Sequence, residues 1–408
     1  MQYRYEQIYQ TEADLARYLA LTEQMQELGH GAGELRFFSA PGRSELGGNH
    51  TDHQLGCVLA AAVDVDTVAA AAENGTDKIR LRSAGFPPCE LSVDPAENTD
   101  VPKGSAASLL AGMIAAFAPI CTLRGLDICA SSTVLPGGGL SSSASFEVVL
   151  AELFNALFCG DSLHPVKLAQ LGQWVENEYF GKPCGLLDQT ASAVGGATFM
   201  DFADPAEPVV EKLPLDLNAF GHALFIINCG ADHADLTDEY AAIPGELKAL
   251  CACFGAKTLS QVDEDAFYDR LSELRQTCSD RAVLRAIHVY EENLRVRRQR
   301  EALLAGDFPA YLELVRASGL SSWRFLQNIS PRGSLSQPMA VTLAVCEKLL
   351  EGEGACRVHG GGFAGTVQAY VPLGRAEEFR IQMERILPTC SCRRHTVREV
   401  GAAEVLLG

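Results

Sequence analysis

Residues 137–145 combine three glycines with four serines, a composition suited to binding phosphate. The strand-like segment 126–135 precedes them, and the periodic apolar segment 146–158 that follows predicts a helix. A glycine-rich loop between a strand and a helix directs several backbone N–H groups at an anion. A serine-rich helix cap is the alternative, but a cap would not require three consecutive glycines. We therefore predict that a polyphosphate is bound by Gly137, Gly138, Gly139, Leu140, Ser141, Ser142, Ser143 and Ala144.

This loop matches neither of two common glycine-rich nucleotide motifs. The sequence contains no G-x-x-x-x-G-K-[ST] pattern, and no G-x-G-x-x-G opens a Rossmann unit. A second glycine-rich stretch, HGGGFAG at 359–365, would by itself indicate only a turn between strands. Beside the first loop it becomes a second candidate for contact with the same ligand.

Four segments in order resemble the GHMP kinase superfamily, and galactokinases in particular. APGRSELGGNHTDHQLG at 40–56 is similar to the signature A-P-G-R-x-N-L-I-G-E-H-T-D-Y-N-G-G, and PGGGLSSSAS at 136–145 is similar to the nucleotide loop. VENEYFGKPCGLLDQTAS at 175–192 resembles A-E-N-x-x-x-G-x-x-x-G-I-M-D-Q, and GGGFAG at 360–365 resembles the third motif. The resemblance implies phosphorylation of a galactose-like sugar at its anomeric hydroxyl, with ATP and Mg²⁺.

The resemblance also assigns roles to residues. Asp188 would accept the proton of the anomeric hydroxyl, and Arg43 would lie between that carboxylate and the γ-phosphate. Glu176 would bind Mg²⁺ together with Ser142 or Ser143. Phosphoryl transfer itself requires mainly alignment and charge stabilisation, which these residue types supply. The structural alternatives are a helix cap for Asp188 and a loop-anchoring ion pair for Arg43. The positions that would contact sugar hydroxyls are His50, Asp52, Gly185 and Tyr240.

Three positions depart from the signature. Asn49 stands where the family carries Glu, Glu45 where it carries Asn, and His53 where it carries Tyr. In the family that Glu faces the hydroxymethyl end of the sugar, whereas Asn49 is uncharged and adds an N–H donor. Asn49 either binds the O6 hydroxyl of galactose or belongs to a pocket for a changed C6, such as the carboxylate of galacturonate. We favour galactose because the other sugar-contacting positions are intact.

Two other functions fit parts of the pattern. Catalytically silent sugar sensors share the fold of galactokinases, but such proteins can lose parts of the serine-rich loop, which is complete here. Kinases of homoserine or mevalonate share the loop but lack the segment His50-Thr51-Asp52. The sequence therefore favours a sugar kinase over both alternatives.

The composition restricts the partners and the compartment. The chain has 408 residues and a formal net charge of −19, so it would repel nucleic acids and anionic membranes. The compact basic run at 295–300 has acidic neighbours, which is typical of a solvated helix face. No apolar run approaches the ~20 residues of a membrane span. Fourteen cysteines without a signal peptide favour reduced thiols and a cytoplasmic protein. We expect a sugar and ATP as partners; the oligomeric state stays open.

Helical and strand patterns mix without regular βαβ alternation, which indicates an α+β protein. In the first half we predict a helix over 1–32 with Leu15, Leu19 and Leu21 on its buried stripe, a loop over 41–56 and a strand over 57–72. Further predicted elements are short strands within 78–93, a helix over 104–118 and a strand over 197–202. Trp174 and Trp323 have apolar surroundings and are predicted to be core residues.

The second half predicts a strand over 222–230, several helices between about 236 and 352, one strand over 357–372, a helix and a final strand. The Asp-, Pro- and Glu-rich segment 204–216 predicts a boundary between two lobes, 1–210 and 211–408. The resemblance implies a two-lobed GHMP kinase fold, with an N-terminal lobe like ribosomal protein S5 and a C-terminal α/β sandwich.

Overall fold

The computed structural model describes residues 1–9, 14–230, 237–363 and 365–407. Its larger sheet is built around two long antiparallel strands, β2 (Arg36–Gly47) and β3 (Cys57–Glu73). The strand order is β1-β13-β2-β3-β6-β4-β5, while β7 pairs with the first residues of β3, and β8 pairs with β7. The other strands are β1 (Gln2–Arg4), β4 (Lys78–Ser83), β5 (Cys89–Ser92), β6 (Leu126–Ser132), β7 (Ala197–Asp201), β8 (Val209–Leu213) and β13 (Ala403–Leu406).

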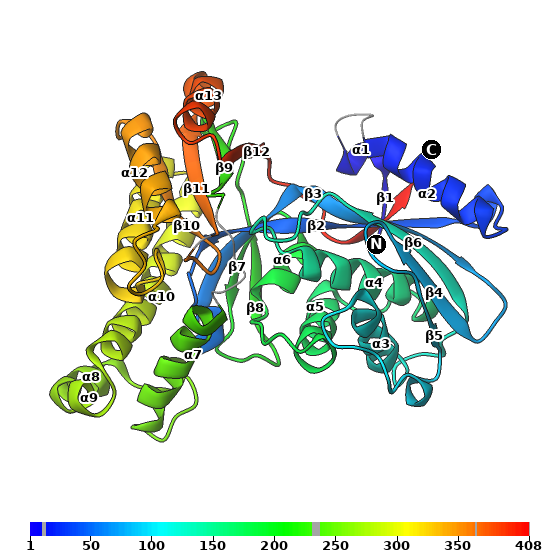
Figure 1. Ribbon diagram of the computed structural model, residues 1–408, viewed down its shortest axis with the longest axis horizontal. Coiled ribbons are helices and arrows are strands. Elements are labelled where there is room, and N and C mark those ends of the chain that lie inside the picture. The colour runs from blue at the N-terminus through cyan, green and yellow to red at the C-terminus, as the bar shows by residue number, and fades with distance from the viewer. Residues whose placement is uncertain (10–13, 231–236, 364, 408) are drawn as a thin grey trace.

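Alternation along β3 gives each face of this sheet its own core. Ala69 and Ala71 pack into one apolar cluster, whereas Val68 and Ala70 pack into another, as the period of two in a strand requires. The first face is covered by four helices and the second by α2, as Figure 1 shows. These helices are α2 (Leu15–Glu27), α3 (Ala106–Phe117), α4 (Ser142–Phe158), α5 (Pro165–Val175) and α6 (Leu187–Val194); a short α1 (Tyr5–Ile8) follows β1.

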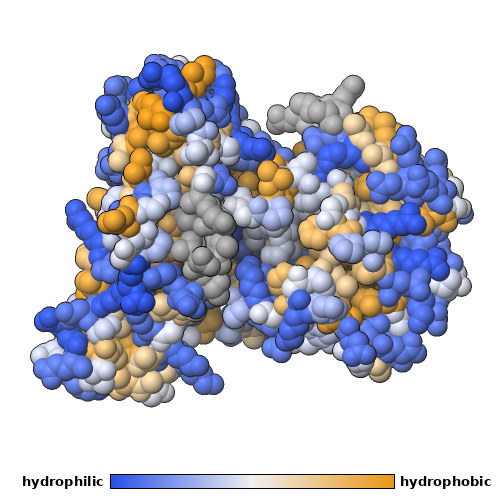
Figure 2. Space-filling view, in the orientation of Figure 1, coloured by the Kyte–Doolittle hydropathy of each residue, from blue (hydrophilic) through white to orange (hydrophobic). Residues whose placement is uncertain are grey.

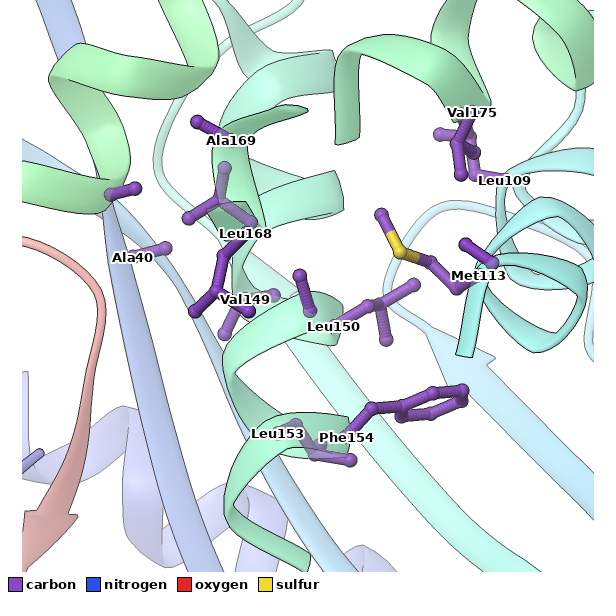
Figure 3. Close-up of a cluster of buried hydrophobic side chains, with 14 of the residues drawn as sticks. Ala40, Leu109, Met113, Val149, Leu150, Leu153, Phe154, Leu168, Ala169 and Val175 are labelled. Atoms are coloured by element: carbon purple, nitrogen blue, oxygen red, sulfur yellow. The ribbon is translucent and has the colours of Figure 1, made fainter. Parts of the chain in front are cut away.

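Helix α4 is apolar on most of its surface because it lies between the sheet and its neighbouring helices. Its side chains Leu150 and Phe154 point toward Met113 of α3, as Figure 3 shows. Fully burying an apolar side chain of this size stabilises the fold by about 1.5–3 kcal/mol. The packing holds the N-terminus of α4, where the serine-rich segment begins, in a fixed place.

A second, antiparallel sheet has the order β10-β11-β9-β12. Helices α12 and α13 pack on one of its faces, and α11 packs on the other, which also contacts the first sheet. The strands are β9 (His222–Asn228), β10 (Ala355–His359), β11 (Thr366–Pro372) and β12 (Ser391–His395). The helices of this half are α7 (Thr237–Ala252), α8 (Glu264–Asp269), α9 (Leu271–Thr277), α10 (Asp280–Leu304), α11 (Phe308–Ser321), α12 (Pro338–Leu350) and α13 (Ala376–Ile386).

The two sheets share one apolar cluster. Leu59 of β3 and Ile226 of β9 belong to it, together with Val296 of α10 and Tyr311 of α11. The chain also crosses back at its end, because β13 pairs antiparallel with β2 and parallel with β1. The division into two lobes near residue 210 stays a prediction. In addition, β13 from the end of the chain pairs with strands of the first sheet.

The structure corrects the predictions for the first half in two places. The segment 1–32 is not one helix, because β1 and α1 precede α2; the buried residues of α2 are Tyr18, Leu21 and Met25, while Leu19 is exposed. The predicted loop over 41–56 is shorter, because β2 continues to Gly47. Proline and glycine within β2 coincide with an irregularity in its pairing with β3, which explains the loop-like sequence.

Two further predictions are also wrong. The single strand over 357–372 is a hairpin of β10 and β11 joined by the second glycine-rich stretch. Trp174 and Trp323 keep 42% and 45% of their surface exposed, so neither is a core residue. Both lie on helices, where an apolar neighbourhood in sequence does not fix the direction of one side chain.

The visible surface mixes hydrophilic and hydrophobic side chains (Figure 2). None of the helices in the described ranges is long and apolar enough to cross a membrane.

Candidate active site

Arg43 and Asp188 form an ion pair at the centre of the candidate site. Arg43 lies on β2, and Asp188 lies in the first turn of α6. Arg43 Nε donates to Asp188 Oδ1 at 2.7 Å, and Ser141 Oγ donates to Asp188 Oδ2. Burial would raise the pKa of Asp188, but Arg43 and the two hydrogen bonds hold that pKa below its usual value. The carboxylate is therefore ionised at neutral pH and able to accept a proton.

The glycine-rich loop between β6 and α4 is fastened to this pair. Arg43 Nη1 donates to the carbonyl of Gly139 at 2.6 Å. Gly137 and Gly139 have φ values of 74° and 73°, which glycine adopts without steric cost. The loop ends at Ser142, the first residue of the 17-residue helix α4. The unpaired N–H groups and the dipole at that helix end favour a bound anion.

Two of the predicted loop residues have buried side chains. Leu140 packs in the cluster shared by the two sheets, and Ala144 is fully buried in α4. At these positions only the backbone can face a ligand.

Glu176 lies at the centre of a polar cluster beside the loop. Ser143 Oγ donates to Glu176 Oε1 at 2.8 Å, and Lys182 Nζ lies 3.0 Å from the same oxygen. The amide of Gln189 donates to Glu176 Oε2 at 2.8 Å and to Glu147 Oε2 at 2.9 Å. Burial and the nearby Glu176 raise the pKa of Glu147 well above its usual value. Gln189 thus holds two buried carboxyl groups side by side.

This cluster offers hard oxygen ligands of the kind that Mg²⁺ prefers. Ser143 and Glu176 present a hydroxyl and a carboxylate oxygen that already lie 2.8 Å apart. Ser142 lines the same cavity as Ser143 and Lys182. The residues predicted to bind the metal therefore fit Mg²⁺ in type and position.

The predicted sugar-binding residues come from both halves of the chain. His50 lies in the turn after β2, and its Nε2 donates to the carbonyl of Gly361 in the second glycine-rich stretch at 3.1 Å. Burial, with a smaller contribution from His53, lowers the pKa of His50 to about 3. Tyr240 of α7 donates its hydroxyl to the carbonyl of Gly362 at 2.9 Å. His50 is thus neutral at physiological pH, and its Nε2 carries the hydrogen.

Asp52 and Gly185 are in close contact. A Cβ placed on Gly185 would lie 1.9 Å from Asp52 Oδ2, so a larger residue there would displace the Asp52 side chain. Gly185 lies three residues before Asp188, which brings the turn after β2 next to the start of α6.

Asn49 is not among the residues that line the cavity at this site, and the polar groups of its side chain are already hydrogen-bonded within the protein. It is completely buried, and its Nδ2 donates to the carbonyl of Gly360 at 2.6 Å and to Glu45 Oε1 at 3.1 Å. Its Oδ1 accepts from Asn328 at 2.8 Å and from Ser322 at 3.4 Å. An amide has two donor hydrogens and two acceptor positions, so all of them are in use. The expectation that Asn49 directly binds the sugar therefore has no support in this geometry.

A cavity of about 250 Å³ lies between the two glycine-rich stretches. It joins the ion pair, the serines of the first loop and Tyr240, whereas His50, Asp52, Gly185 and Glu176 lie outside its lining. The lining residues are Arg43, Leu135, Gly137, Gly139, Ser141, Ser142, Ser143, Lys182, Asp188, Tyr240, His359, Gly360, Gly361, Gly362, Gly365 and Thr366.

Comparison with known proteins places this geometry in a family. The GHMP kinases N terminal domain matches residues 105–196, and the galactokinase galactose-binding signature matches residues 26–73. Galactokinase from Streptomyces coelicolor is 34% identical over 357 residues, which cover 84% of this chain and 86% of that protein. The chain belongs to the galactokinase family.

Solved structures agree with this membership of the galactokinase family. The structure of Lactococcus lactis galactokinase complexed with galactose has a TM-score of 0.81 at 25% identity, covering 95% of this chain and 99% of that one. A mevalonate kinase has a TM-score of 0.60 at 15% identity over 89% of this chain and 99% of its own, a likeness of fold alone. The mixed α+β GHMP kinase fold predicted from the sequence is confirmed.

Several residues at this galactokinase-type site were not among those predicted from the sequence. Lys182 contacts Glu176, Gln189 joins two carboxyl groups, and Glu147 is one of them. His359 lies in the cavity lining and contacts Ser44 and Thr366. For Lys182 and Gln189 a signal exists, because both fall in the same motif as Glu176 and Asp188. A buried Glu within an apolar helix is the corresponding signal for Glu147.

Proposed function

We propose that this chain transfers the γ-phosphoryl group of ATP to the anomeric hydroxyl of galactose. The observation that carries the proposal is the contact between Asp188, Arg43 and the glycine-rich loop: a carboxylate, a guanidinium and a phosphate-binding backbone meet within hydrogen-bond distances. Membership of the galactokinase family supports galactose as the substrate.

In the proposed reaction Asp188 accepts the proton as the anomeric oxygen attacks the γ-phosphorus. The bond from that phosphorus to the β,γ-bridging oxygen breaks, and ADP leaves. Arg43 keeps Asp188 ionised before the reaction and offsets the negative charge on the transferred phosphoryl group. Ser141, which donates to Asp188 Oδ2, helps to fix the orientation of the carboxylate beside the cavity.

Residues Gly137–Ala144, which include the first residues of α4, would bind the phosphates of ATP through backbone N–H groups. Ser142, Ser143 and Glu176 would hold Mg²⁺, which supplies charge neutralisation for the phosphates when it is bound. Lys182 Nζ, 3.0 Å from Glu176, adds a positive charge at the same end of the cavity.

His50, Asp52, Gly185 and Tyr240 would surround the sugar. Asp52 accepts hydrogen bonds from sugar hydroxyls. Because a larger residue at 185 would displace Asp52, Gly185 acts by leaving space. Tyr240 lies against Gly361, so it joins α7 to the second glycine-rich stretch next to the cavity.

These contributions support two lobes, 1–210 and 211–408, with the ligands between them. Arg43, Asp188 and the phosphate loop come from the first, while Tyr240 and Gly361 come from the second. A site enclosed from two sides excludes water from the γ-phosphate.

Because ATP is a cytosolic substrate and the fourteen cysteines are free thiols, we propose that the protein is located in the cytoplasm.

The test is ADP release from Mg-ATP with galactose, N-acetylgalactosamine, galacturonate, arabinose and glucose, with the phosphate position assigned by NMR. We expect galactose 1-phosphate as the main product. Phosphorylation of galacturonate in preference to galactose would replace the substrate. No transfer to any sugar, with retained binding of galactose, would instead favour a sugar sensor.

A further inference from the structure

Glu45 and Asn49 form a buried pair of a carboxylate and an amide next to the proposed sugar-binding residues. The two positions exchange the residue types of the signature, so that a carboxylate is present at 45 instead of 49. Glu45 keeps 8% of its side chain exposed, and Asn49 keeps none. A buried carboxylate is costly unless it is paired and hydrogen-bonded.

One oxygen of Glu45 is held by the protein. Oε1 accepts from Arg357, which is completely buried, and from Asn49 Nδ2 at 3.1 Å. Arg357 is itself fixed by the carbonyl of Leu46 and the hydroxyl of Ser318, each at 3.2 Å. Oε2 makes only the longer contact of 3.4 Å with Asn49 among the described residues. The carboxylate is thus anchored through one oxygen, and the other retains capacity for a hydrogen-bond donor.

Glu45 lies on β2 two residues after Arg43, which lines the cavity, while Glu45 itself is outside that lining. Arg43, Ser44 and Glu45 pair in regular register with Ala62, Ala61 and Ala60, so residues 43 and 45 share one face of β2.

Electrostatics agrees with this placement. Burial raises the pKa of Glu45 to about 7, while Arg357 and Arg43 lower it and Asp52 raises it further. Asp52 in turn touches Gly185, three residues before Asp188. Glu45 therefore lies in the electrostatic reach of both the catalytic arginine and the proposed sugar-binding aspartate.

We infer that Glu45 binds the primary hydroxyl of the sugar, with Asn49 and Arg357 as its positioning residues. The inference rests on the proposed function and names the group that selects the substrate. A carboxylate accepts a hydrogen bond from a neutral hydroxymethyl group and repels the carboxylate of a uronic acid. The site therefore selects neutral hexoses over galacturonate.

The experiment compares galactose with 6-deoxygalactose, which differs only in the hydroxyl that Glu45 binds. Steady-state kcat/KM is measured at pH 8, above the pKa of Glu45, for the wild-type chain and for Glu45→Gln. We expect the variant to lose about 10- to 100-fold on galactose, the loss of a charge-assisted hydrogen bond, and to change little on 6-deoxygalactose. Glu207→Gln, at an exposed glutamate, is the matched control and should leave both sugars unaffected.

A second set of variants tests the pairing with Asn49. Asn49→Glu alone places two carboxylates next to each other in a buried site and should reduce activity on galactose more than tenfold. Adding Glu45→Asn removes one of them, so the double variant should recover at least tenfold over Asn49→Glu. Absence of this recovery would overturn the positioning role of Asn49.

The two levels of failure are distinguishable. If wild-type chain makes no galactose 1-phosphate, the proposed function fails and this inference fails with it. If Glu45→Gln loses the same factor on galactose and on 6-deoxygalactose, Glu45 is only structural and the inference alone is wrong. The ratio of the two rates is insensitive to a fraction of unfolded variant, since both sugars are measured on the same preparation.

Discussion

At the scale of single residues, the site depends on a few charges that hold one another in place. Arg43 contacts both Asp188 and the carbonyl of Gly139, so one guanidinium aligns the proposed base and the phosphate loop. Its planar fork of donors suits this double task, which a lysine ammonium would not perform equally. One side chain thus fixes the carboxylate and the glycine-rich loop relative to each other.

Replacing Asp188 by Asn is expected to abolish most of the transfer activity. The amide has nearly the same shape but cannot accept the proton, so kcat should fall by roughly 10²- to 10⁴-fold. Nucleotide affinity should change little, because Asp188 is not part of the loop backbone, whereas the unfolding midpoint should fall, because the buried Arg43 loses its charged partner. Single-turnover kinetics measures the rate of transfer, calorimetric titration with ATP measures the nucleotide affinity, and thermal unfolding measures the midpoint. Near-normal turnover would remove Asp188 as the base.

Replacing Arg43 by Gln should change the pH dependence of the reaction as well as its rate. In the folded protein Arg43 lowers the pKa of Asp188, so the base stays ionised until the pH falls below the usual carboxylate range. Without the guanidinium the pKa of Asp188 rises, so the acid limb of the kcat profile should move to higher pH. A profile that loses amplitude without moving would show that Arg43 acts on the phosphate alone.

At the scale of elements, the phosphate loop is constrained from two sides. A Cβ on Gly139 would lie 2.3 Å from Thr366 Oγ1 and 3.0 Å from His359 Nδ1, and the residue has a positive φ. The loop therefore combines a backbone conformation that glycine requires with a close approach to β11.

Gly139→Ala is expected to weaken ATP binding by at least tenfold, because either the loop or β11 must shift. The control is Gly221→Ala, which has a similar φ of 70° but no atom within 4 Å of the added Cβ. Both variants should lose about 1 kcal/mol of stability from the positive φ. Only Gly139→Ala should also change the affinity for ATP, measured by titration. Equal affinities in the two variants would contradict the close fit of the loop.

Elements with a clear period or motif could be predicted from the sequence. The strand over 57–72, the helix after the serines and the helix over 104–118 are confirmed, since local pattern determines them. The extent of β2 could not be predicted, because its proline and glycines are tolerated only by an irregular pairing with β3 that forms over a distance.

Site residues followed the same division. Asp188 and Arg43 meet as the motifs predicted, although they are 145 positions apart in the chain. The hydrogen bonds that occupy the amide of Asn49 come from Asn328 and go to the carbonyl of Gly360. Both residues are distant from Asn49 in the sequence, and nothing in their sequence pattern indicates this contact. Motif spacing assigns a residue to a site, but its free hydrogen-bonding groups depend on neighbours from the other half of the chain.

At the scale of the whole molecule, the chain ends are joined to the first sheet by one buried carboxylate. Asp66 of β3 accepts hydrogen bonds from Arg17 of α2, from Arg398 near the C-terminus at 2.9 Å and from Ser39 at 2.6 Å. Its exposed fraction is 1%. A helix at one end of the chain and a segment at the other thus depend on the same group.

Asp66→Asn should destabilise the fold without affecting the reaction. Two arginines would lose their charged partner, which costs about 3–5 kcal/mol in the free energy of unfolding. Burial would raise the pKa of Asp66, but Arg17 and Arg398 hold that pKa below its usual value. The ionised Asp66 therefore stabilises the fold above about pH 4, and this contribution is lost as the pH falls through the folded-state pKa. The free energy of unfolding, measured with urea, should therefore differ more between the wild-type chain and the variant at pH 7 than at pH 3. Asp100→Asn, at an exposed aspartate, is the control and should match the wild-type chain at both pH values. A normal kcat with a large loss of stability in Asp66→Asn would show that Asp66 supports the fold and not the reaction. A free energy of unfolding that is unchanged at pH 7 would refute its role in joining the chain ends.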